Sequence, residues 1–320
     1  ESMNKDQSMT LNASSSSPGA GLEVPDVPHA SLATAAPGGG TWRMVLAMAL
    51  SGTIGLLVVE SGLPALWVVW LRCILGGLGL ATWVVVSRQW RTPTRSELRW
   101  LLLGGLALIV NWLCLFRAYH YSGIAIATVV YHVQPFLLLL LAALLQVEAL
   151  PLRRMPWLLL ALVGVVFSSG LLGDGAHQAS WQGIGLALLA ASLYAVATLT
   201  TQRLKRIAPA QIAMLQMGVG ALALLPFVWE LRAGVVFSPK AWAAVLVLGL
   251  VHTAWMYTLM YTAFQRLKAQ AIAGLSYIYP VMALLVDLLW FGVKPQPAQW
   301  LGMALILGSV WAYRRGEQKT

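Results

Sequence analysis

Two charged side chains interrupt long apolar stretches of this 320-residue chain. Arg72 follows the run ALWVVWL, and Asp287 lies within VMALLVDLLW. A charge inside such a stretch is costly and by default marks a place where an ion or a charged ligand binds. Arg72 could attract a carboxylate, act as the counter-ion of an acid such as Asp287, or form a fixed pair with Glu60. Asp287 could hold a proton or a cationic group, or could be a partly hydrated residue near a helix end.

A second group of polar and aromatic residues precedes two prolines. YHVQP at 131–135 and SYIYP at 276–280 each open a long apolar run. A proline inside a helix removes a backbone hydrogen bond and bends the helix, and the freed carbonyl must meet a polar neighbour or a cavity. We therefore expect helix kinks at Pro135 and Pro280 and one central cavity lined by both segments. The alternative is that the kinks serve packing alone.

Other residues of the same kinds lie in neighbouring apolar stretches. A histidine changes charge near neutral pH when water reaches it, although a hydrogen-bonded packing role is more common. Asparagine and glutamine inside a membrane either bond to a ligand or join helices. No catalytic residue, metal ligand or cofactor is predicted. The predicted ligand-binding residues are Arg72, Asn111, Trp112, Tyr131, His132, Gln134, His252, Tyr257, Tyr277 and Asp287.

Lipid is the expected surrounding of this chain, because 59% of its residues are hydrophobic and only 10% are charged. Soluble domains carry about 25% charged residues, and a helix of about 20 mostly apolar residues crosses a bilayer. We predict an all-α integral membrane protein with ten transmembrane helices, a disordered tail at 1–41 and a short tail at 315–320. The predicted spans are 42–59, 65–87, 98–118, 123–146, 155–173, 182–203, 210–230, 241–264, 269–293 and 297–314.

The basic residues indicate how the spans are oriented. The formal net charge of +10 could suggest a nucleic-acid partner, but the Lys and Arg residues lie in short breaks between apolar runs. Most of them fall in alternate connections, and cytoplasmic loops hold such an excess. We therefore expect no nucleic acid, and a multi-pass protein of the plasma membrane (bacterial inner membrane) with both termini cytoplasmic. The residues are Lys5, Arg43, Arg88, Arg91, Arg95, Arg99, Arg153, Arg154, Arg203, Lys205, Arg206, Arg266, Lys268, Arg314, Arg315 and Lys319.

The sequence also repeats itself at an offset of 145 residues, the separation of Pro135 from Pro280. A unit of five spans is odd, so its second copy must enter the membrane from the opposite side, as in inverted-repeat transporters. We predict two inverted five-helix repeats at 42–173 and 182–314, with a ligand site near the midplane between them. Further identities at this offset are Leu101/Leu246, Leu103/Leu248, Gly104/Gly249 and Ala118/Ala263.

Several of these features together resemble the EamA family of the drug/metabolite transporter superfamily. They are the five-plus-five duplication, Arg72 in LRC of the second span, and Tyr131 and Pro135 followed by an apolar run that ends in Glu148. SGTIGLLVVESG in the first span is also similar to the family pattern, and the resemblance covers 42–314. One departure is GVK at 292–294, where the family often carries an acid. Glu148 itself, beside two arginines, is expected to pair within its loop.

The resemblance implies a secondary-active transporter that works by alternating access. We expect an exporter of small organic metabolites such as amino acids, driven by a gradient of protons or of the substrate itself. The expected partners are the metabolite and the lipid bilayer. Small residues in spans five and ten, including Gly164 and Gly302, could pack the two halves together or form a homodimer interface.

Two other classes of function remain as alternatives. The first is an intramembrane enzyme, which would need a convergent set of reactive residues, and the sequence has neither H-E-x-x-H nor G-x-S-x-G. The second is a channel or a membrane scaffold that transports nothing. A channel would favour polar rings on several spans, whereas the polar residues here are scattered. Saturation of transport by substrate separates a carrier from a channel and from a scaffold.

Overall fold

The computed structural model describes residues 39–169, 171, 180–292 and 294–317, without the side chains at 124, 125, 287 and 317. The predicted tail at 1–41 lies outside the described residues, except for its last positions, which already belong to the first helix. The end of the predicted tail at 315–320 also lies outside them. The tail predictions are therefore not tested by the fold.

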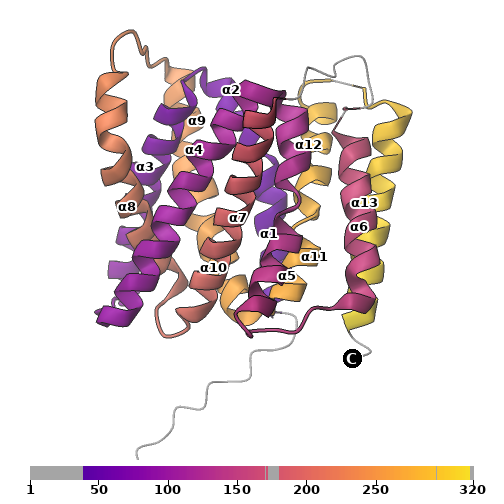
Figure 1. The fold of residues 1–320 in the computed structure, drawn as a ribbon. Coiled ribbons are helices and arrows are strands. Elements are labelled where there is room, and N and C mark those ends of the chain that lie inside the picture. Colours follow the sequence, from indigo (N-terminus) through magenta and orange to yellow (C-terminus); the bar gives the residue numbers. More distant parts are fainter. Residues whose placement is uncertain (1–38, 170, 172–179, 293, 318–320) are drawn as a thin grey trace, which may run out of the picture. The chain divides into compact units, whose positions relative to one another are not determined.

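All regular elements of the described ranges are helical, as the composition predicts (Figure 1). Most are α-helices, and two short elements have other helical geometries: η1 is a 3₁₀-helix and η2 is a π-helix. In chain order they are α1 (Gly39–Gly52), α2 (Ile54–Ser61), α3 (Ala65–Val86), α4 (Arg95–Tyr131), α5 (Gln134–Leu144), η1 (Leu152–Arg154), α6 (Met155–Ser168), α7 (Trp181–Arg203), α8 (Pro209–Glu230), α9 (Pro239–Gly249), η2 (Leu250–Trp255), α10 (Met256–Arg266), α11 (Ala269–Leu275), α12 (Ile278–Leu289) and α13 (Pro297–Glu317).

Eight helical segments of the described chain are long and apolar enough to cross a membrane. This makes the molecule an all-helical, multi-pass membrane protein. The ten predicted spans all coincide with helices, but α6 and α13 are not among the eight. The described part of α6 has only 14 residues. The eight segments are Gly39–Ser61, Ala65–Val86, Arg95–Gly123, Ile126–Leu144, Trp181–Arg203, Pro209–Glu230, Pro239–Arg266 and Ala269–Val286.

Four of the membrane segments are interrupted rather than continuous. Thr53 separates α1 from α2, and η2 separates α9 from α10. Residues 132–133 separate α4 from α5, and residues 276–277 separate α11 from α12. Each interruption leaves backbone groups without their usual helical partners, and side chains must supply the missing hydrogen bonds. The candidate site is built at these interruptions.

Local sequence explains where several helices begin and turn. Thr94 and Glu97 form a capping box at the start of α4, in which each side chain bonds to the backbone of the other residue. Ser238 caps α9 by accepting a hydrogen bond of 3.0 Å from the backbone N–H of Ala241. Gly123 has a φ of 72°, which favours glycine, and the chain turns there within α4 from one membrane segment into the next.

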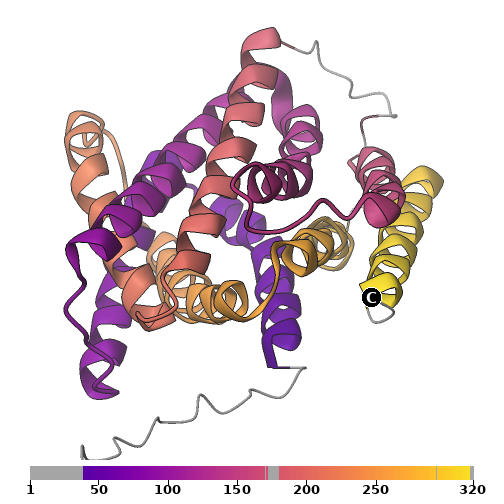
Figure 2. The ribbon, with the colours of Figure 1, turned by 60° about the horizontal axis from the view of Figure 1, so that its bottom comes forward.

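α6 and α13 pack against each other at one side of the bundle (Figure 2). Glycine permits their close approach, because a Cβ atom on Gly302 would lie 2.6 Å from the carbonyl oxygen of Gly164. The other extensive pairings join α4 to α7 and α3 to α8, while α1 lies against α10 and α12. Spans five and ten of the prediction are thus neighbours within one chain.

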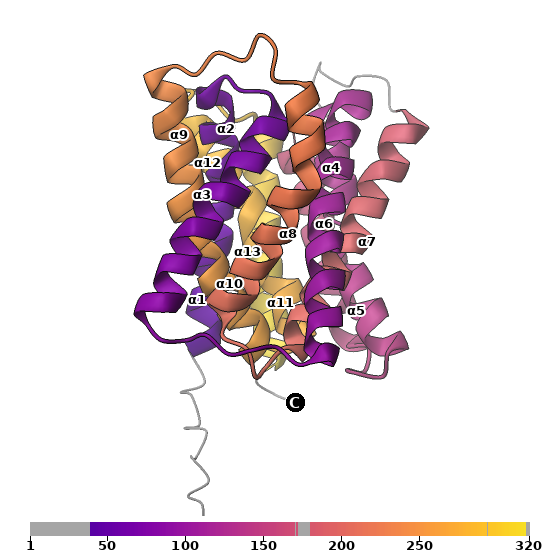
Figure 3. The ribbon, with the colours of Figure 1, turned by 90° about the vertical axis from the view of Figure 1, so that its left-hand side faces the viewer.

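The two ends of the bundle differ in charge. At the basic end, the connections at 87–94, 145–154, 204–208 and 267–268, the helix ends beside them, and the outer ends of α1 and α13 together carry most of the described Lys and Arg residues. The first and last helices meet at this end, where Arg314 donates a hydrogen bond of 3.3 Å to the hydroxyl of Thr41. The opposite end includes the connection between α8 and α9 (Figure 3).

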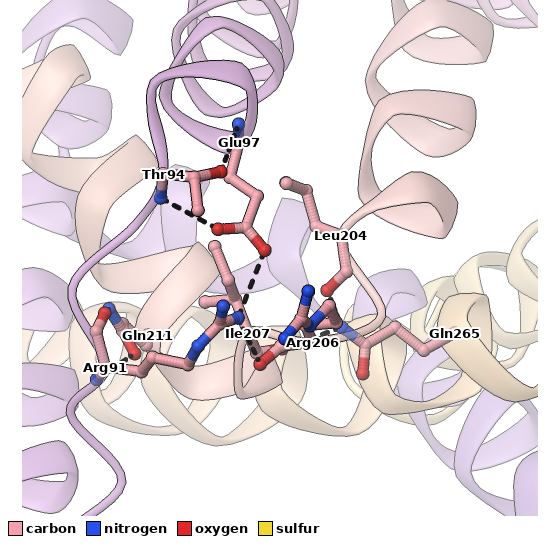
Figure 4. A network of polar contacts seen from close by, with 8 residues as sticks. All are labelled: Arg91, Thr94, Glu97, Leu204, Arg206, Ile207, Gln211 and Gln265. Carbon is pink, nitrogen blue, oxygen red and sulfur yellow. Dashed lines mark hydrogen bonds and ion pairs between the residues drawn. The ribbon is translucent and has the colours of Figure 1, made fainter.

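Polar side chains hold the connections of the basic end to one another (Figure 4). The Gln211 amide bonds twice to the backbone of Arg91, with distances of 3.0 and 2.6 Å. The Arg91 guanidinium forms an ion pair of 3.1 Å with Glu97. Gln265 donates to two carbonyls of the 204–207 connection at 2.8 and 2.9 Å.

Glu148 also lies at the basic end, and its expected pairing within its own loop is wrong. Its carboxylate instead accepts hydrogen bonds from the backbone N–H groups of Ala269, at 2.7 Å, and Gln270, at 3.3 Å. The first N–H groups of a helix have no intrahelical partner, and a carboxylate is stabilised there. Glu148 thus joins the connection that follows α5 to the start of α11.

Candidate functional site

Arg72 lies in the middle of α3 and is only 4% exposed. Its Nε donates to the hydroxyl of Thr253 at 3.1 Å, and one terminal nitrogen donates to the carbonyl of His252 at 3.3 Å. The guanidinium carbon is 5.2 Å from the ring centroid of Trp112, which suits a cation–π contact. All three neighbours are neutral acceptors, so the positive charge of Arg72 is not balanced by them.

The fixed pair between Arg72 and Glu60 is not formed. Glu60 forms an ion pair with Lys240 and accepts a hydrogen bond from Trp290, both at the opposite end of the bundle. Among the residues whose side chains are described, no carboxylate lies within ion-pairing distance of Arg72.

The π-helix η2 supplies the two groups that hold Arg72. A π-turn joins backbone groups five residues apart, and the hydroxyl of Thr253 also donates to the carbonyl five residues earlier, that of Leu248, at 2.8 Å. This wider turn presents the His252 carbonyl and the Thr253 oxygen toward α3. Gly76 permits the approach of α3, since a Cβ atom there would lie 2.5 Å from the Thr253 methyl group. π-Bulges inside α-helices are frequent at functional sites.

His252 links η2 to the interruption in the first span. Its Nε2 is 2.8 Å from the hydroxyl oxygen of Thr53, the residue between α1 and α2. The Thr53 hydroxyl donates its own hydrogen to the carbonyl of Leu50 at 2.8 Å. The other ring nitrogen of His252, Nδ1, is 3.4 Å from the carbonyl oxygen of Val247, so both ring nitrogens have a polar partner.

The two proline segments meet at His132 and Tyr277. The Tyr277 hydroxyl donates to the carbonyl of His132 at 3.1 Å. That carbonyl is open because the N–H of Phe136, its usual partner, donates to Val133 instead. The His132 ring stacks on Tyr279 at 5.6 Å, and its Nδ1 is 2.7 Å from the carbonyl of Thr128, to which it donates.

Two buried amide side chains near this junction have polar atoms without partners. The Asn111 nitrogen donates to the carbonyl of Ala190 at 2.7 Å and to the Tyr131 hydroxyl at 3.3 Å, but its Oδ1 bonds to no described residue. Nε2 of Gln134 likewise has no partner in the described chain. Buried polar groups are nearly always satisfied, so these atoms are available to a ligand.

Aromatic rings connect the two parts of the site. Trp112 meets Tyr257 edge to face with centroids 6.2 Å apart, and Tyr257 meets Tyr261 at 5.4 Å. On the other side, Tyr131 meets Tyr194 at 6.2 Å. We use the name central aromatic cluster for Trp112, Tyr131, Tyr194, Tyr257 and Tyr261.

Most of the predicted ligand-binding residues therefore fall into two neighbouring groups. The first group consists of Arg72, Trp112, His252 and Tyr257. The second group, at or beside the junction of the two proline segments, consists of Asn111, Tyr131, His132, Gln134 and Tyr277. The side chain of Asp287 lies outside the described residues, and its helix α12 packs on α1, α6 and α13, away from α3. Sequence reasoning missed Thr53, Tyr194 and Thr253.

A surface pocket of about 390 Å³ lies elsewhere, at the opposite end of the bundle. It is lined by residues of the 62–64 turn and of the connection between α8 and α9. None of the predicted ligand-binding residues lines it. The site above is therefore defined by its polar and aromatic contacts.

Comparisons with known proteins are consistent with this architecture. The model of the EamA-like transporter family matches residues 42–170 and 181–314. An uncharacterized transporter of Bacillus subtilis (strain 168), YxxF, is 29% identical over 84% of this chain and 87% of its own length. A second from the same organism, YwfM, is 26% identical over 80% of this chain and 86% of its length. A crystal structure described only as that of a protein shares the fold, with a TM-score of 0.74, 22% identity, and coverage of 85% of this chain and 96% of its own.

Proposed function

Because this chain belongs to the EamA-like transporter family, we propose that it is a secondary-active carrier that exports small organic metabolites, such as amino acids, by alternating access. The observation that carries this proposal is the junction of YHVQP and SYIYP. Both segments interrupt membrane helices, and both bring aromatic and polar side chains to one place. Interrupted helices lining a central site are typical of secondary transporters.

An inverted repeat of two five-helix halves is supported by contacts between equivalent residues. His132 and Tyr277 are 145 positions apart, and so are Trp112 and Tyr257. Both pairs are in contact. In a two-fold arrangement, a residue can touch its own equivalent only where both lie near the axis. We therefore infer a pseudo-two-fold axis that passes through the central aromatic cluster, where inverted-repeat carriers bind substrate.

The pairing of α6 with α13 is consistent with the same axis, because they correspond to spans five and ten of the repeat. The family model also matches the chain over two successive ranges, which favours a duplication. We propose ten transmembrane helices on this basis, with α6 and α13 as the two at the edge. Their pairing within one chain leaves their outer faces for lipid or for a second copy.

The basic end of the bundle is proposed to face the cytoplasm. Cytoplasmic loops and the helix ends beside them are enriched in Lys and Arg, and the described connections and helix ends at this end carry most of these residues. Both ends of the helical region meet there, through Thr41 and Arg314. The termini would then be cytoplasmic, and the membrane would be the plasma membrane of a bacterium.

During export, the interrupted helices would let their two halves tilt separately. The contact of Tyr277 with His132 and that of His252 with Thr53 each join an interruption in one half to an interruption in the other. We propose that these contacts are exchanged as the site changes access from one side to the other. The energy would come from a gradient of protons or of the metabolite.

Efflux from proteoliposomes tests the proposal. Vesicles holding the full chain are loaded with a panel of labelled metabolites that includes amino acids, and initial rates are measured against internal concentration. A carrier gives saturable efflux of at least one compound. Linear, unsaturated efflux would indicate a channel, and rates equal to those of empty vesicles would indicate that the protein does not transport the panel; either result contradicts the proposal.

Gln134→Met separates a ligand-binding role from a packing role, because methionine keeps the volume of this buried side chain and removes only its amide. Since Nε2 of Gln134 has no partner in the described chain, the midpoint of thermal unfolding should stay within about 2 °C of the parent. The KM for efflux should rise about tenfold if a hydrogen bond to the metabolite is lost. Gln296→Met, which removes an exposed amide at the opposite end, is the matched control and should change neither quantity.

A further inference from the structure

Arg72 is the only Asp, Glu, Lys or Arg that is buried among the side chains the structure describes. A guanidinium has five N–H donors. Its two hydrogen bonds use Nε and one terminal nitrogen, and the remaining N–H groups of the terminal nitrogens make no hydrogen bond within the described chain. A paired arrangement of terminal N–H groups matches the two oxygens of a carboxylate.

We infer that Arg72 binds the carboxylate of the exported metabolite, and that Trp112 and Tyr257 contact the apolar part beside it. This inference rests on the proposed carrier function and names the class of its substrate. The three residues come from α3, α4 and α10, and Trp112 contacts both Arg72 and Tyr257. Trp112 and Tyr257 also form the pair of equivalent residues that marks the inferred axis.

The anchoring of Arg72 favours a ligand over a structural role. A buried charge in a membrane protein is normally balanced by an opposite charge. Thr253 and the His252 carbonyl fix the position of the guanidinium but contribute no negative charge. Arg72 is thus held in place with no anion beside it among the described side chains, and it is pre-organised for an incoming anion, because little conformational freedom is lost on binding.

The site also indicates how much charge the substrate carries. α8 begins and ends 144 positions after α3, and the offset at His132 and Tyr277 is 145, so the residue equivalent to Arg72 is Gln216 or Met217, and both are neutral. Only one half of the bundle therefore contributes a cation at this level. A single guanidinium beside neutral and aromatic groups fits one carboxylate, whereas a phosphate or a dicarboxylate would leave negative charge uncompensated.

Competition between matched compounds tests the inference on the full chain in proteoliposomes. Each pair differs only at the acid: phenylalanine with phenylalaninamide, leucine with leucinamide, and benzoate with benzamide. Each compound is scored for inhibition of the saturable efflux and for protection against thermal unfolding. We expect at least one acid to act at a concentration tenfold or more below that of its amide. Equal potency of acid and amide in every pair would overturn the inference.

Arg72→Gln should reduce that preference to about onefold, and Arg72→Lys should leave an intermediate preference because lysine keeps the charge without the planar fork. Arg232→Gln is the matched control, since it removes an exposed arginine at the opposite end and should keep the full preference. A full preference in Arg72→Gln would overturn the inference.

Thr253→Val provides a second variant if Arg72→Gln does not fold. It removes the oxygen that accepts from Nε of Arg72 and keeps the shape and the charge. The preference for acid over amide should fall severalfold, while Thr253→Ser should retain it. An unchanged preference in Thr253→Val would count against the site as described.

The outcomes distinguish this inference from the proposed function. Saturable efflux with equal potency of acids and amides would support the carrier function and contradict the carboxylate site. Thermal protection by acids alone that depends on Arg72, in vesicles that show no efflux, would support the carboxylate site and contradict the carrier function.

Discussion

The hydroxyl of Tyr277 donates a hydrogen bond of 3.1 Å to the backbone carbonyl of His132, which lies 145 positions earlier in the chain. This hydrogen bond gives the His132 carbonyl the partner that the interrupted helix does not supply. Pro135 has no N–H, the helix ends before it, and the N–H of Phe136 turns to Val133. One interrupted helix is thus completed by a side chain from the other.

Tyr277→Phe should destabilise the protein by about 1–3 kcal/mol, because the buried carbonyl of His132 loses its partner. Thermal unfolding of the purified chain in detergent measures the loss as a lower midpoint. Tyr121→Phe is the control, since Tyr121 is 38% exposed and its hydroxyl can bond to water. Equal midpoints for both variants would show that the bond contributes nothing.

Thr53→Val should also destabilise the protein by about 1–3 kcal/mol. The change removes the oxygen that bonds to Nε2 of His252 and leaves this buried ring nitrogen without its partner. Thr53→Ser keeps the oxygen and should behave like the parent. If valine and serine have the same effect on unfolding, the methyl group rather than the hydrogen bond is what matters at this position.

The ion pair of Glu60 with Lys240 should contribute little to stability, because the Lys240 side chain is 70% exposed and water weakens the attraction between exposed charges. A double-mutant cycle with Glu60→Gln and Lys240→Gln measures the coupling free energy from chemical unfolding. The coupling should shrink further at about 1 M salt, where screening acts within about 3 Å. A large coupling free energy that salt leaves unchanged would contradict this view of an exposed pair.

Two glycines of α13 should respond in opposite directions to alanine. In Gly302→Ala the new Cβ would lie 2.6 Å from a carbonyl of α6, and the resulting strain should cost about 1–3 kcal/mol. In Gly308→Ala the Cβ meets no atom within 4 Å, and the higher helix propensity of alanine should stabilise the helix by up to about 1 kcal/mol. Unfolding free energies of the two variants test the packing of α6 on α13. Stabilisation by both would contradict it.

The sequence predicts the class of fold well, because an apolar run long enough to cross a membrane must form a helix to satisfy its backbone hydrogen bonds. The family resemblance is confirmed, and helices coincide with all ten predicted spans. Two of them, α6 and α13, fall outside the eight segments that meet a criterion of length and apolarity. The interruptions before Pro135 and Pro280 could also be predicted, because proline lacks a backbone N–H and disfavours a continuous helix.

The partners of the candidate site could not be predicted in the same way. Arg72 bonds to Thr253, 181 positions away, and not to Glu60. Such a contact depends on how two helices are rotated and how far each is shifted along its axis, and spacing within one helix carries no information on either. The π-turn at η2 also has no simple signature, because LVHTAW contains no Gly or Pro that would mark an irregular helix.

We propose that the two halves of this protein have opposite orientations in the membrane, and cysteine labelling tests this most directly. Tyr121 and Arg266 are exposed, 145 positions apart, and near the ends of equivalent membrane segments. Single-cysteine variants at these positions, in a chain whose Cys73 and Cys114 are replaced, are treated in intact cells with a membrane-impermeant maleimide. We predict that Tyr121→Cys is labelled from outside and that Arg266→Cys is labelled only after the cells are permeabilised. Labelling of both from the same side would contradict it.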